Sequence, residues 1–187
     1  MSHHPLRLWF KVKALQCFRM GLLGLFIVFC TVMGDRTGIG TATAEAARAT
    51  APSFELVTLS GEAYRNESLK GRPTLLAFWA PWCKVCQREL PLLAQFYGKE
   101  KPAPLRVLSI GFADIRANVE AFVKTRPSTF VFPTAYDEDR WVAQAFKINA
   151  TPTYVLIDAQ GSIVLVHRGG GLLQNVEFRG FLATLKK

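Results

Sequence analysis

Two cysteines separated by two residues stand where an apolar segment gives way to a helical one. The apolar segment, Thr74–Trp79, is hydrophobic on both faces, which is typical of a central strand in a helix-covered sheet. Pro81 follows, and Cys83-Lys84-Val85-Cys86 then begins a predicted helix that ends near Tyr97. Because residues i and i+3 share a helix face, the two sulfur atoms lie within bridging distance. We therefore expect a disulfide that can form and open at this junction.

The position of the first cysteine favours its reactive form. A thiolate, not a thiol, attacks a disulfide, and a helix start directs unpaired N–H groups and a positive dipole end at the sulfur of Cys83. Lys84 adds a positive charge, and both effects lower the pKa of a thiol. We expect Cys86, one turn further along, to be buried and to resolve the mixed disulfide by attacking Cys83. Glu89 is the only nearby acid on the same face, so it is the candidate acceptor of the Cys86 proton, directly or through water. The alternative is a solvent-exposed glutamate beside Arg88.

The cysteine content favours a redox-active pair over a structural one. The chain has four cysteines, of which Cys17 and Cys30 precede the predicted domain. A disulfide that closes so short a loop removes little entropy from the unfolded chain and would stabilise a fold only slightly. A tetrahedral zinc site would need two further ligands, and His167 is the only histidine after position 4. We therefore expect no metal ion and no cofactor beyond the redox-active disulfide.

The N-terminal region is organised like an export signal. Basic residues precede an uncharged apolar run from Met20 to Gly34, and small residues follow at Ala42 and Ala44. Cleavage after Ala44 would release a soluble protein. The alternative is a retained membrane anchor, although the run is shorter than the roughly 20 residues that span a bilayer. In either case the preceding positive charges keep the N-terminus in the cytoplasm, so we expect a periplasmic or otherwise extracytoplasmic domain.

One domain is expected after this region. We predict a signal peptide or anchor over residues 1–44, a linker over 45–52 and a single domain over 53–187. The formal net charge is +9, and residues 1–44 contribute +4 of it. Because the other basic residues are scattered, a solvated basic surface is favoured over nucleic-acid binding. Contact with a membrane is expected only through the N-terminal segment.

Strand and helix patterns alternate through the domain. Strands are predicted at residues 54–57, 74–79, 105–111, 130–133, 154–158 and 162–167, and helices at 83–97, 115–125, 137–148 and 172–185. Residues 60–62 are predicted to be a turn, 66–73 a loop and 169–171 a flexible break. This order predicts an α/β fold, with a central mixed β-sheet flanked by helices on both faces. The early crossovers suit parallel strands, and the terminal hairpin is antiparallel.

Two segments carry a family resemblance. The segment from Phe78 through Trp79-Ala80-Pro81-Trp82 to Cys86 resembles the active-site segment of the thioredoxin superfamily, and Thr151-Pro152-Thr153 resembles its cis-proline loop. The export leader, Glu89-Leu90-Pro91 and the helix-plus-strand pattern between residues 105 and 133 resemble the TlpA/ResA/CcmG branch. Members of that branch are extracytoplasmic reductases, many of which serve cytochrome c maturation. The resemblance covers roughly residues 53–187 and implies a thioredoxin-like fold.

The resemblance assigns further roles by position. Glu89 matches the active-site glutamate of the branch. Pro152 would be cis, which X-Pro bonds permit at modest cost. Thr151 would then offer backbone groups to an extended substrate segment, in the manner of strand addition. Trp82 would form part of an apolar rim. An ordinary loop turn is the alternative for Thr151-Pro152.

Two departures from the superfamily pattern bear on the chemistry. Ala77 stands where cytoplasmic thioredoxins carry a buried acid, so proton transfer would depend on Glu89. The dipeptide Lys84-Val85 lacks the proline often found before the second cysteine. A shift of 30 mV in reduction potential corresponds to about 1.4 kcal/mol, so modest thiolate stabilisation can reverse the direction of electron flow.

These features favour an exported thiol-disulfide oxidoreductase, with a periplasmic disulfide reductase as the leading interpretation. Its expected partners are an oxidised protein substrate, such as an apocytochrome c, and a membrane thiol-disulfide electron donor. The alternatives are a disulfide-forming oxidant, a copper-stress thiol protein of the ScsD kind, and a redox-inert thioredoxin-fold binding module. A peroxidase is disfavoured, because the chain lacks a lone peroxidatic cysteine motif.

Overall fold

The computed structural model describes residues 48–100 and 104–185. The predicted signal peptide or anchor, residues 1–44, lies outside the described residues. Among the helices of the described ranges, none is long and apolar enough to cross a membrane. Within the predicted linker, Thr50 forms a bridge with Ser162, and the Ala51 amide donates to the Gly161 carbonyl at 2.9 Å. The last linker residues therefore pair with a hairpin of the domain.

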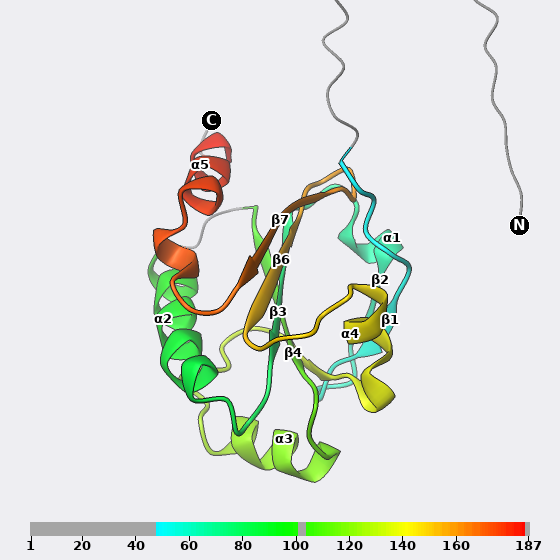
Figure 1. Ribbon diagram of the computed structural model, residues 1–187, viewed down its shortest axis with the longest axis vertical. Helices are drawn as coiled ribbons and strands as arrows, with labels where there is room; N and C mark the ends of the chain where they lie inside the picture. Colours follow the sequence, from blue (N-terminus) through cyan, green and yellow to red (C-terminus); the bar gives the residue numbers. More distant parts are fainter. Residues whose placement is uncertain (1–47, 101–103, 186–187) are drawn as a thin grey trace, which may run out of the picture. The chain divides into compact units, whose positions relative to one another are not determined.

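A five-stranded mixed sheet forms the centre of the described domain (Figure 1), in the order β5-β4-β3-β6-β7. Its strands are β3 (Thr74–Trp79), β4 (Arg106–Gly111), β5 (Thr134–Tyr136), β6 (Thr153–Ile157) and β7 (Ile163–Arg168). β4 pairs in parallel with both β3 and β5, whereas β6 is antiparallel to both β3 and β7. The predicted mixed sheet, with parallel crossovers followed by an antiparallel hairpin, is confirmed.

Helices cover both faces of this sheet, as predicted. The helices are α1 (Asn66–Leu69), α2 (Lys84–Glu100), α3 (Arg116–Lys124), α4 (Trp141–Ala145) and α5 (Val176–Thr184). Figure 1 shows α2 and α5 on one side of the sheet and α1 and α4 on the other. The helix α3 lies at the end of the sheet where the parallel strands β3 and β4 finish. This arrangement leaves the start of α2 beside the carboxyl end of β3.

The side chains of β3 alternate between two hydrophobic clusters. Leu76 and Phe78 belong to the cluster that includes β1, β2 and α4, while Leu75 and Ala77 belong to the cluster that includes α2 and α5. All six residues of β3 are buried because both faces of the strand are covered. Trp79, the last of them, packs in a third cluster with the two cysteines of the motif. The strand therefore anchors the active-site turn in the core.

Two short elements lie where the sequence predicted no strand or helix. The structure places β2 (Ala63–Arg65) between the predicted turn and loop, and α1 (Asn66–Leu69) within that loop. β2 pairs antiparallel with β1 (Glu55–Val57). With three and four residues, β2 and α1 are too short for a hydrophobic period to reveal them.

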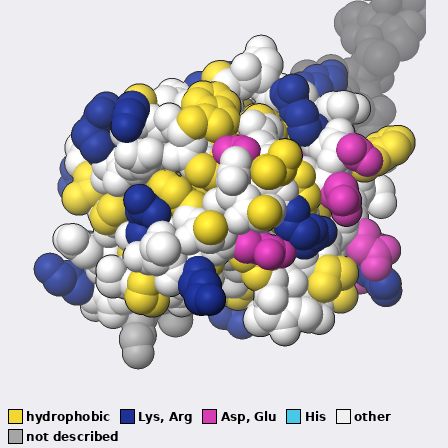
Figure 2. Space-filling model, turned by 90° about the horizontal axis from the view of Figure 1, so that it is seen from below, with side chains coloured by type: hydrophobic (Ala, Val, Ile, Leu, Met, Phe, Trp, Pro, Cys, Tyr) yellow, Lys and Arg dark blue, Asp and Glu magenta, His cyan; other side chains and the backbone are white. Residues whose placement is uncertain are grey.

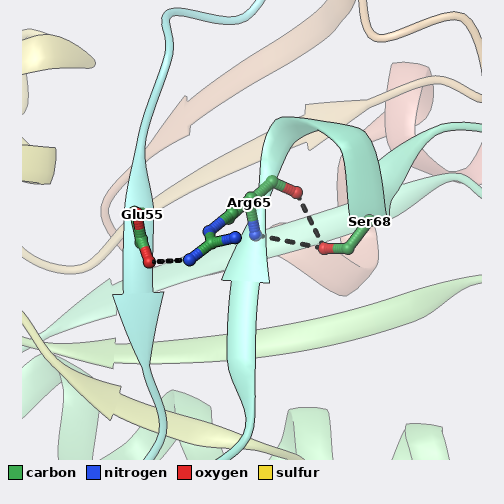
Figure 3. Close-up of polar contacts among 3 residues, drawn as sticks. All are labelled: Glu55, Arg65 and Ser68. Carbon is green, nitrogen blue, oxygen red and sulfur yellow. Dashed lines mark hydrogen bonds and ion pairs between the residues drawn. The ribbon is translucent and has the colours of Figure 1, made fainter.

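Polar contacts on the surface join β1, β2 and α1 (Figure 3). The Arg65 guanidinium donates to the Glu55 carboxylate, directly across the β1–β2 ladder. At the start of α1 the Arg65 amide donates to Ser68 Oγ at 3.1 Å, and the Ser68 hydroxyl donates to the Arg65 carbonyl at 2.7 Å. Because both side chains of this ion pair are exposed to solvent, it contributes little to stability, and the buried side chains of the hairpin contribute more.

The fifth strand and the helix after it differ from the prediction. The strand predicted at residues 130–133 is wrong: β5 begins at Thr134, because Pro133 has no N–H to donate and the apolar Phe132 is buried in the core instead. The helix predicted at 137–148 is shorter, with a 3₁₀ turn at Glu138–Arg140 before α4. Asp137 is only 2% exposed, and its carboxylate accepts from the amides of α4 at 3.0 and 2.7 Å.

The buried Asp137 carboxyl gives the stability of the fold a testable pH dependence. Burial raises the pKa of Asp137 above its ordinary value of 3.8, although backbone N–H donors oppose the shift. The unfolded state therefore ionises first, and the wild type loses stability as the pH rises from 3.8 through the raised pKa. Residue 137 of the Asp137→Asn variant does not titrate, so the variant does not share this loss. We therefore expect the free energy of unfolding of the variant minus that of the wild type to increase as the pH rises over this range. Urea unfolding at a series of pH values measures this difference, and a constant or falling difference would contradict the raised pKa.

Candidate active site

Cys83 and Cys86 form a disulfide at the junction between β3 and α2. Their Cα atoms are 5.2 Å apart, which is within the normal range for a disulfide. The Cys83 amide donates to the Ala80 carbonyl at 3.1 Å, which closes the turn between the strand and the helix. The exposed fractions are 5% for Cys83 and 1% for Cys86, so the first cysteine is the more accessible. This order of exposure suits an attacking and a resolving cysteine.

The start of α2 presents an amide to the first sulfur. The Cys86 N–H donates to Cys83 Sγ at 3.0 Å, so the helix start is aimed at the sulfur as the sequence predicted. Such a donor stabilises negative charge on that sulfur once the disulfide is reduced. Lys84 is the first residue of α2, and its side chain is exposed. Its positive charge is therefore next to the cysteine pair in sequence but is solvated.

The predicted cis-proline loop lies against both cysteines. The Thr151–Pro152 peptide bond is cis. The Thr151 carbonyl oxygen is 3.5 Å from Cys83 Sγ, and Thr151 Oγ1 is 3.1 Å from Cys86 Sγ. Because neither sulfur of a disulfide carries a hydrogen, only the threonine hydroxyl can donate in the second contact, and the Phe78 carbonyl at 3.5 Å is a second acceptor for the same hydrogen. Sequence reasoning assigned only backbone groups of Thr151 to the site and missed this side-chain contact.

Trp82 forms a ridge between two surface cavities beside the disulfide. Its side chain is 58% exposed, and its Nε1–H donates to the Ala113 carbonyl at 3.0 Å. One cavity, of about 370 Å³, is lined by Trp82, Phe112, Ala113, Arg140, Asn149, Ala150 and Thr151. The other, of about 440 Å³, is lined by Trp82, Pro81, Asp114, Asn118, Ala121, Phe122, Thr125 and Arg126. Figure 2 views the domain from the end at which β3 and β4 finish, and shows apolar side chains interspersed with both basic and acidic ones there.

Glu89 lies one turn after Cys86, and its side chain reaches a glycine loop. The residue is half-buried, and its Oε2 accepts from the Gly171 amide at 2.8 Å. Burial, and secondly the negative charge of Glu89, raise the pKa of the neighbouring Tyr154 phenol. The carboxylate is therefore held by a loop distant in sequence. This differs from the alternative in which Glu89 is a solvated residue beside Arg88.

The glycine loop is the part of the site that sequence reasoning missed. Residues 169–171 were predicted to be a flexible break, but the Gly169 amide donates to the Pro152 carbonyl at 2.8 Å, and Gly171 bonds Glu89. Three successive glycines directly after a strand were the available signal. Nothing in their local sequence indicates contacts with residues so far away.

Other cavities and side-chain clusters lie away from the disulfide. One cavity, of about 600 Å³, lies between α2 and α5 and contains none of the predicted site residues. In residues 48–100 and 104–185, no three His, Cys, Asp or Glu side chains are grouped to hold a metal ion.

Comparison with known proteins identifies the family. A family model described as the AhpC/TSA family matches residues 47–166. The thiol-disulfide oxidoreductase ResA of Geobacillus kaustophilus is 31% identical over 135 residues, which cover 72% of this chain and 76% of that relative. ResA of Halalkalibacterium halodurans is 33% identical over 127 residues, covering 68% and 71%.

Solved structures share the fold. The thiol:disulfide interchange protein of the thioredoxin family from Chlorobium tepidum TLS is 26% identical with a TM-score of 0.63, covering 74% of this chain and 99% of its own. StoA from Bacillus subtilis is 25% identical with a TM-score of 0.59, again covering 74% and 99%. The chain therefore belongs to the AhpC/TSA family, and it is a ResA-like thiol-disulfide oxidoreductase with a thioredoxin-like fold.

Proposed function

We propose that this protein is an extracytoplasmic disulfide reductase that transfers two electrons to oxidised protein substrates. One observation carries the proposal: the Cys83–Cys86 disulfide lies at a helix start, against the cis-proline loop. The amide at 3.0 Å from Cys83 Sγ favours the thiolate form of this cysteine after reduction. A pair held in this way is suited to exchange rather than to a permanent cross-link.

Cys83 and Cys86 carry out the exchange in two steps. The Cys83 thiolate attacks a substrate disulfide, one S–S bond forms as the other breaks, and the first substrate sulfur leaves and takes up a proton. Cys86 then loses its proton to Glu89, directly or through water, and attacks Cys83 Sγ. The enzyme disulfide forms and the second substrate sulfur leaves as a thiol. The pair loses two electrons, and a membrane thiol-disulfide donor returns it to the dithiol.

The surface around the cis-proline receives the substrate. Thr151 offers backbone groups next to Cys83 to an extended segment, which adds to the domain as a strand would. Trp82 lies between two cavities and contacts apolar side chains that flank the substrate cysteine. Because Trp82 and Thr151 are far apart in sequence, recognition of the substrate depends on the folded domain.

The cellular setting of the proposal rests on the N-terminal sequence and on the relatives. The order of basic, apolar and small residues in 1–44 supports export, with the domain released or tethered at the outer side of the membrane. The relatives carry the name thiol-disulfide oxidoreductase ResA. An apocytochrome c is the proposed substrate class, because the branch that the sequence resembles serves cytochrome c maturation.

Two single-cysteine variants test the proposed exchange. We expect the wild type to reduce insulin disulfides and Cys83→Ser to lose the activity by about a hundredfold or more, because the attacking sulfur is gone. We expect Cys86→Ser to accumulate a mixed disulfide at Cys83, which mass spectrometry of the trapped adduct identifies. Equal and negligible rates for the wild type and Cys83→Ser would instead support a redox-inert binding module.

Trp82→Ala tests the substrate surface. We expect KM for a protein disulfide to rise about tenfold, equivalent to about 1.4 kcal/mol, because an exposed anchor between two cavities is lost. Reduction of a small aromatic disulfide, which needs no such surface, should be unchanged. Trp141→Ala is the matched control, since Trp141 is 73% exposed and lines neither cavity. A similar rise in KM for both variants would refute a specific role for Trp82.

Glu89→Gln tests the proton acceptor. We expect the attack of Cys83 on substrate to be unchanged and the resolving step to slow by about a hundredfold, since general base catalysis contributes at least that factor. Rapid-quench measurement of the mixed disulfide separates the two steps. Arg88→Gln is the control, because its side chain is on the adjacent, exposed position of the same helix. Normal resolution in Glu89→Gln would remove Glu89 from the mechanism.

A further inference from the structure

We propose that residues Gly169–Gly171 are a positioning element of the active site, which holds the Glu89 carboxylate on one side and the cis-proline loop on the other. The proposal rests on the proton role given to Glu89 above and explains what fixes that carboxylate. These residues were predicted to be a flexible break before the last helix. The structure instead places their backbone between two parts of the site.

Two amides of this loop make the connection. The Gly169 N–H donates to the Pro152 carbonyl at 2.8 Å, which continues the pairing of β6 with β7 up to the cis-proline. Two residues later the Gly171 N–H donates to Glu89 Oε2 at 2.8 Å, across 82 positions of sequence. The carboxylate of α2 and the substrate platform are therefore tied to the same three residues.

The Glu89 carboxylate occupies the space that a side chain at position 170 would fill. A Cβ atom there would lie 2.8 Å from Glu89 Oε1, closer than such atoms approach in proteins, and 3.0 Å from Glu89 Cδ, which is a tight contact. The neighbours of Gly170 differ: Gly169 and Gly171 have φ of 89° and 83°, in the left-handed region that favours glycine, whereas Gly170 lies outside that region. A side chain at position 170 is therefore opposed by the Glu89 carboxylate and not by the backbone conformation.

A histidine and an asparagine support the loop from the other side. His167 Nε2 is 2.9 Å from the Gly170 carbonyl oxygen, which can only accept, so Nε2 carries the hydrogen. Its Nδ1 then accepts from the Asn175 side-chain amide at 3.4 Å. The Asn175 oxygen in turn caps α5 by accepting from the Phe178 amide at 2.9 Å. The loop is therefore fixed to the end of β7 and to the start of α5.

Groups from two elements lie near the carboxylate. The Gly171 amide of the loop donates to it, and burial together with the negative charge of Glu89 raises the pKa of the Tyr154 phenol of β6. The ring of His167, from β7, lies 6.1 Å from the ring of Tyr154. Of these contacts, only the Gly171 amide bonds the carboxylate oxygens directly. The hydrogen bond from the loop is therefore the contact that fixes the orientation of the Glu89 carboxylate.

Gly170→Ala tests this proposal with little risk to folding. The new methyl group meets the end of a flexible side chain, so the Glu89 carboxylate must move while the backbone can stay. We expect the resolving step to slow by about tenfold, a part of the factor that general base catalysis supplies, and its pH profile to shift. Gly180→Ala is the matched control, because a Cβ at Gly180 in α5 meets nothing within 4 Å. A Gly170→Ala variant with the rate and pH profile of Gly180→Ala would overturn the proposal.

A double variant asks whether Gly170 acts through Glu89. In a Glu89→Ala background the new methyl has no carboxylate to displace, so Gly170→Ala should change the remaining rate by less than about twofold. If Gly170→Ala slows the Glu89→Ala enzyme as much as it slows the wild type, the loop acts by another route and the proposal is wrong. Thermal unfolding of each variant accompanies the rates, so that a loss of folded protein is recognised.

An NMR measurement separates this proposal from the proton role of Glu89. The Gly171 amide resonance should move upfield in both Glu89→Ala and Gly170→Ala, because each removes its hydrogen bond to the carboxylate. An unchanged Gly171 resonance in Glu89→Ala would overturn the hold of the loop on Glu89. A displaced resonance combined with normal resolution in Glu89→Gln would refute only the proton role, and would leave the contact between loop and carboxylate established.

Discussion

The contact between the cis-proline loop and the Cys83–Cys86 disulfide is the interaction on which this active site depends. It brings Thr151 to 3.5 Å from one sulfur and 3.1 Å from the other, across more than sixty positions of sequence. The central strand makes this possible: β3 pairs with β6 on one side, and Phe78 is opposite Thr153. The same register that builds the core therefore places the cis-proline loop beside Cys83.

A closed path of contacts surrounds the pair. Cys86 touches Thr151, Pro152 is bonded to Gly169, Gly171 is bonded to Glu89, and Glu89 returns to Cys86 along α2. The proposed mechanism needs a proton acceptor and a substrate-binding surface at fixed positions relative to the same two sulfurs. This path of contacts connects Glu89 and the cis-proline loop, the two segments given those roles, to the disulfide.

Local sequence patterns were enough to predict the central strand and the position of the cysteine pair. The wholly apolar Thr74–Trp79 identified the central strand, and the cysteine spacing at its end identified the reactive pair. Contacts between distant segments could not be predicted in this way. The carboxylate of Glu89, for example, accepts a hydrogen bond from a loop 82 residues away. The glycines of that loop indicated flexibility by composition, whereas in the fold one of them lies directly against this carboxylate.

The reduction potential of the Cys83/Cys86 pair is the most direct test of the proposed direction of electron flow. Equilibration of the protein with glutathione buffers, followed by quantification of the thiols, measures it. We expect a value within or below about −220 to −260 mV, the range of the cytosolic glutathione pool. A value near −120 mV, typical of a strong disulfide-forming oxidant, would contradict the assignment as a reductase.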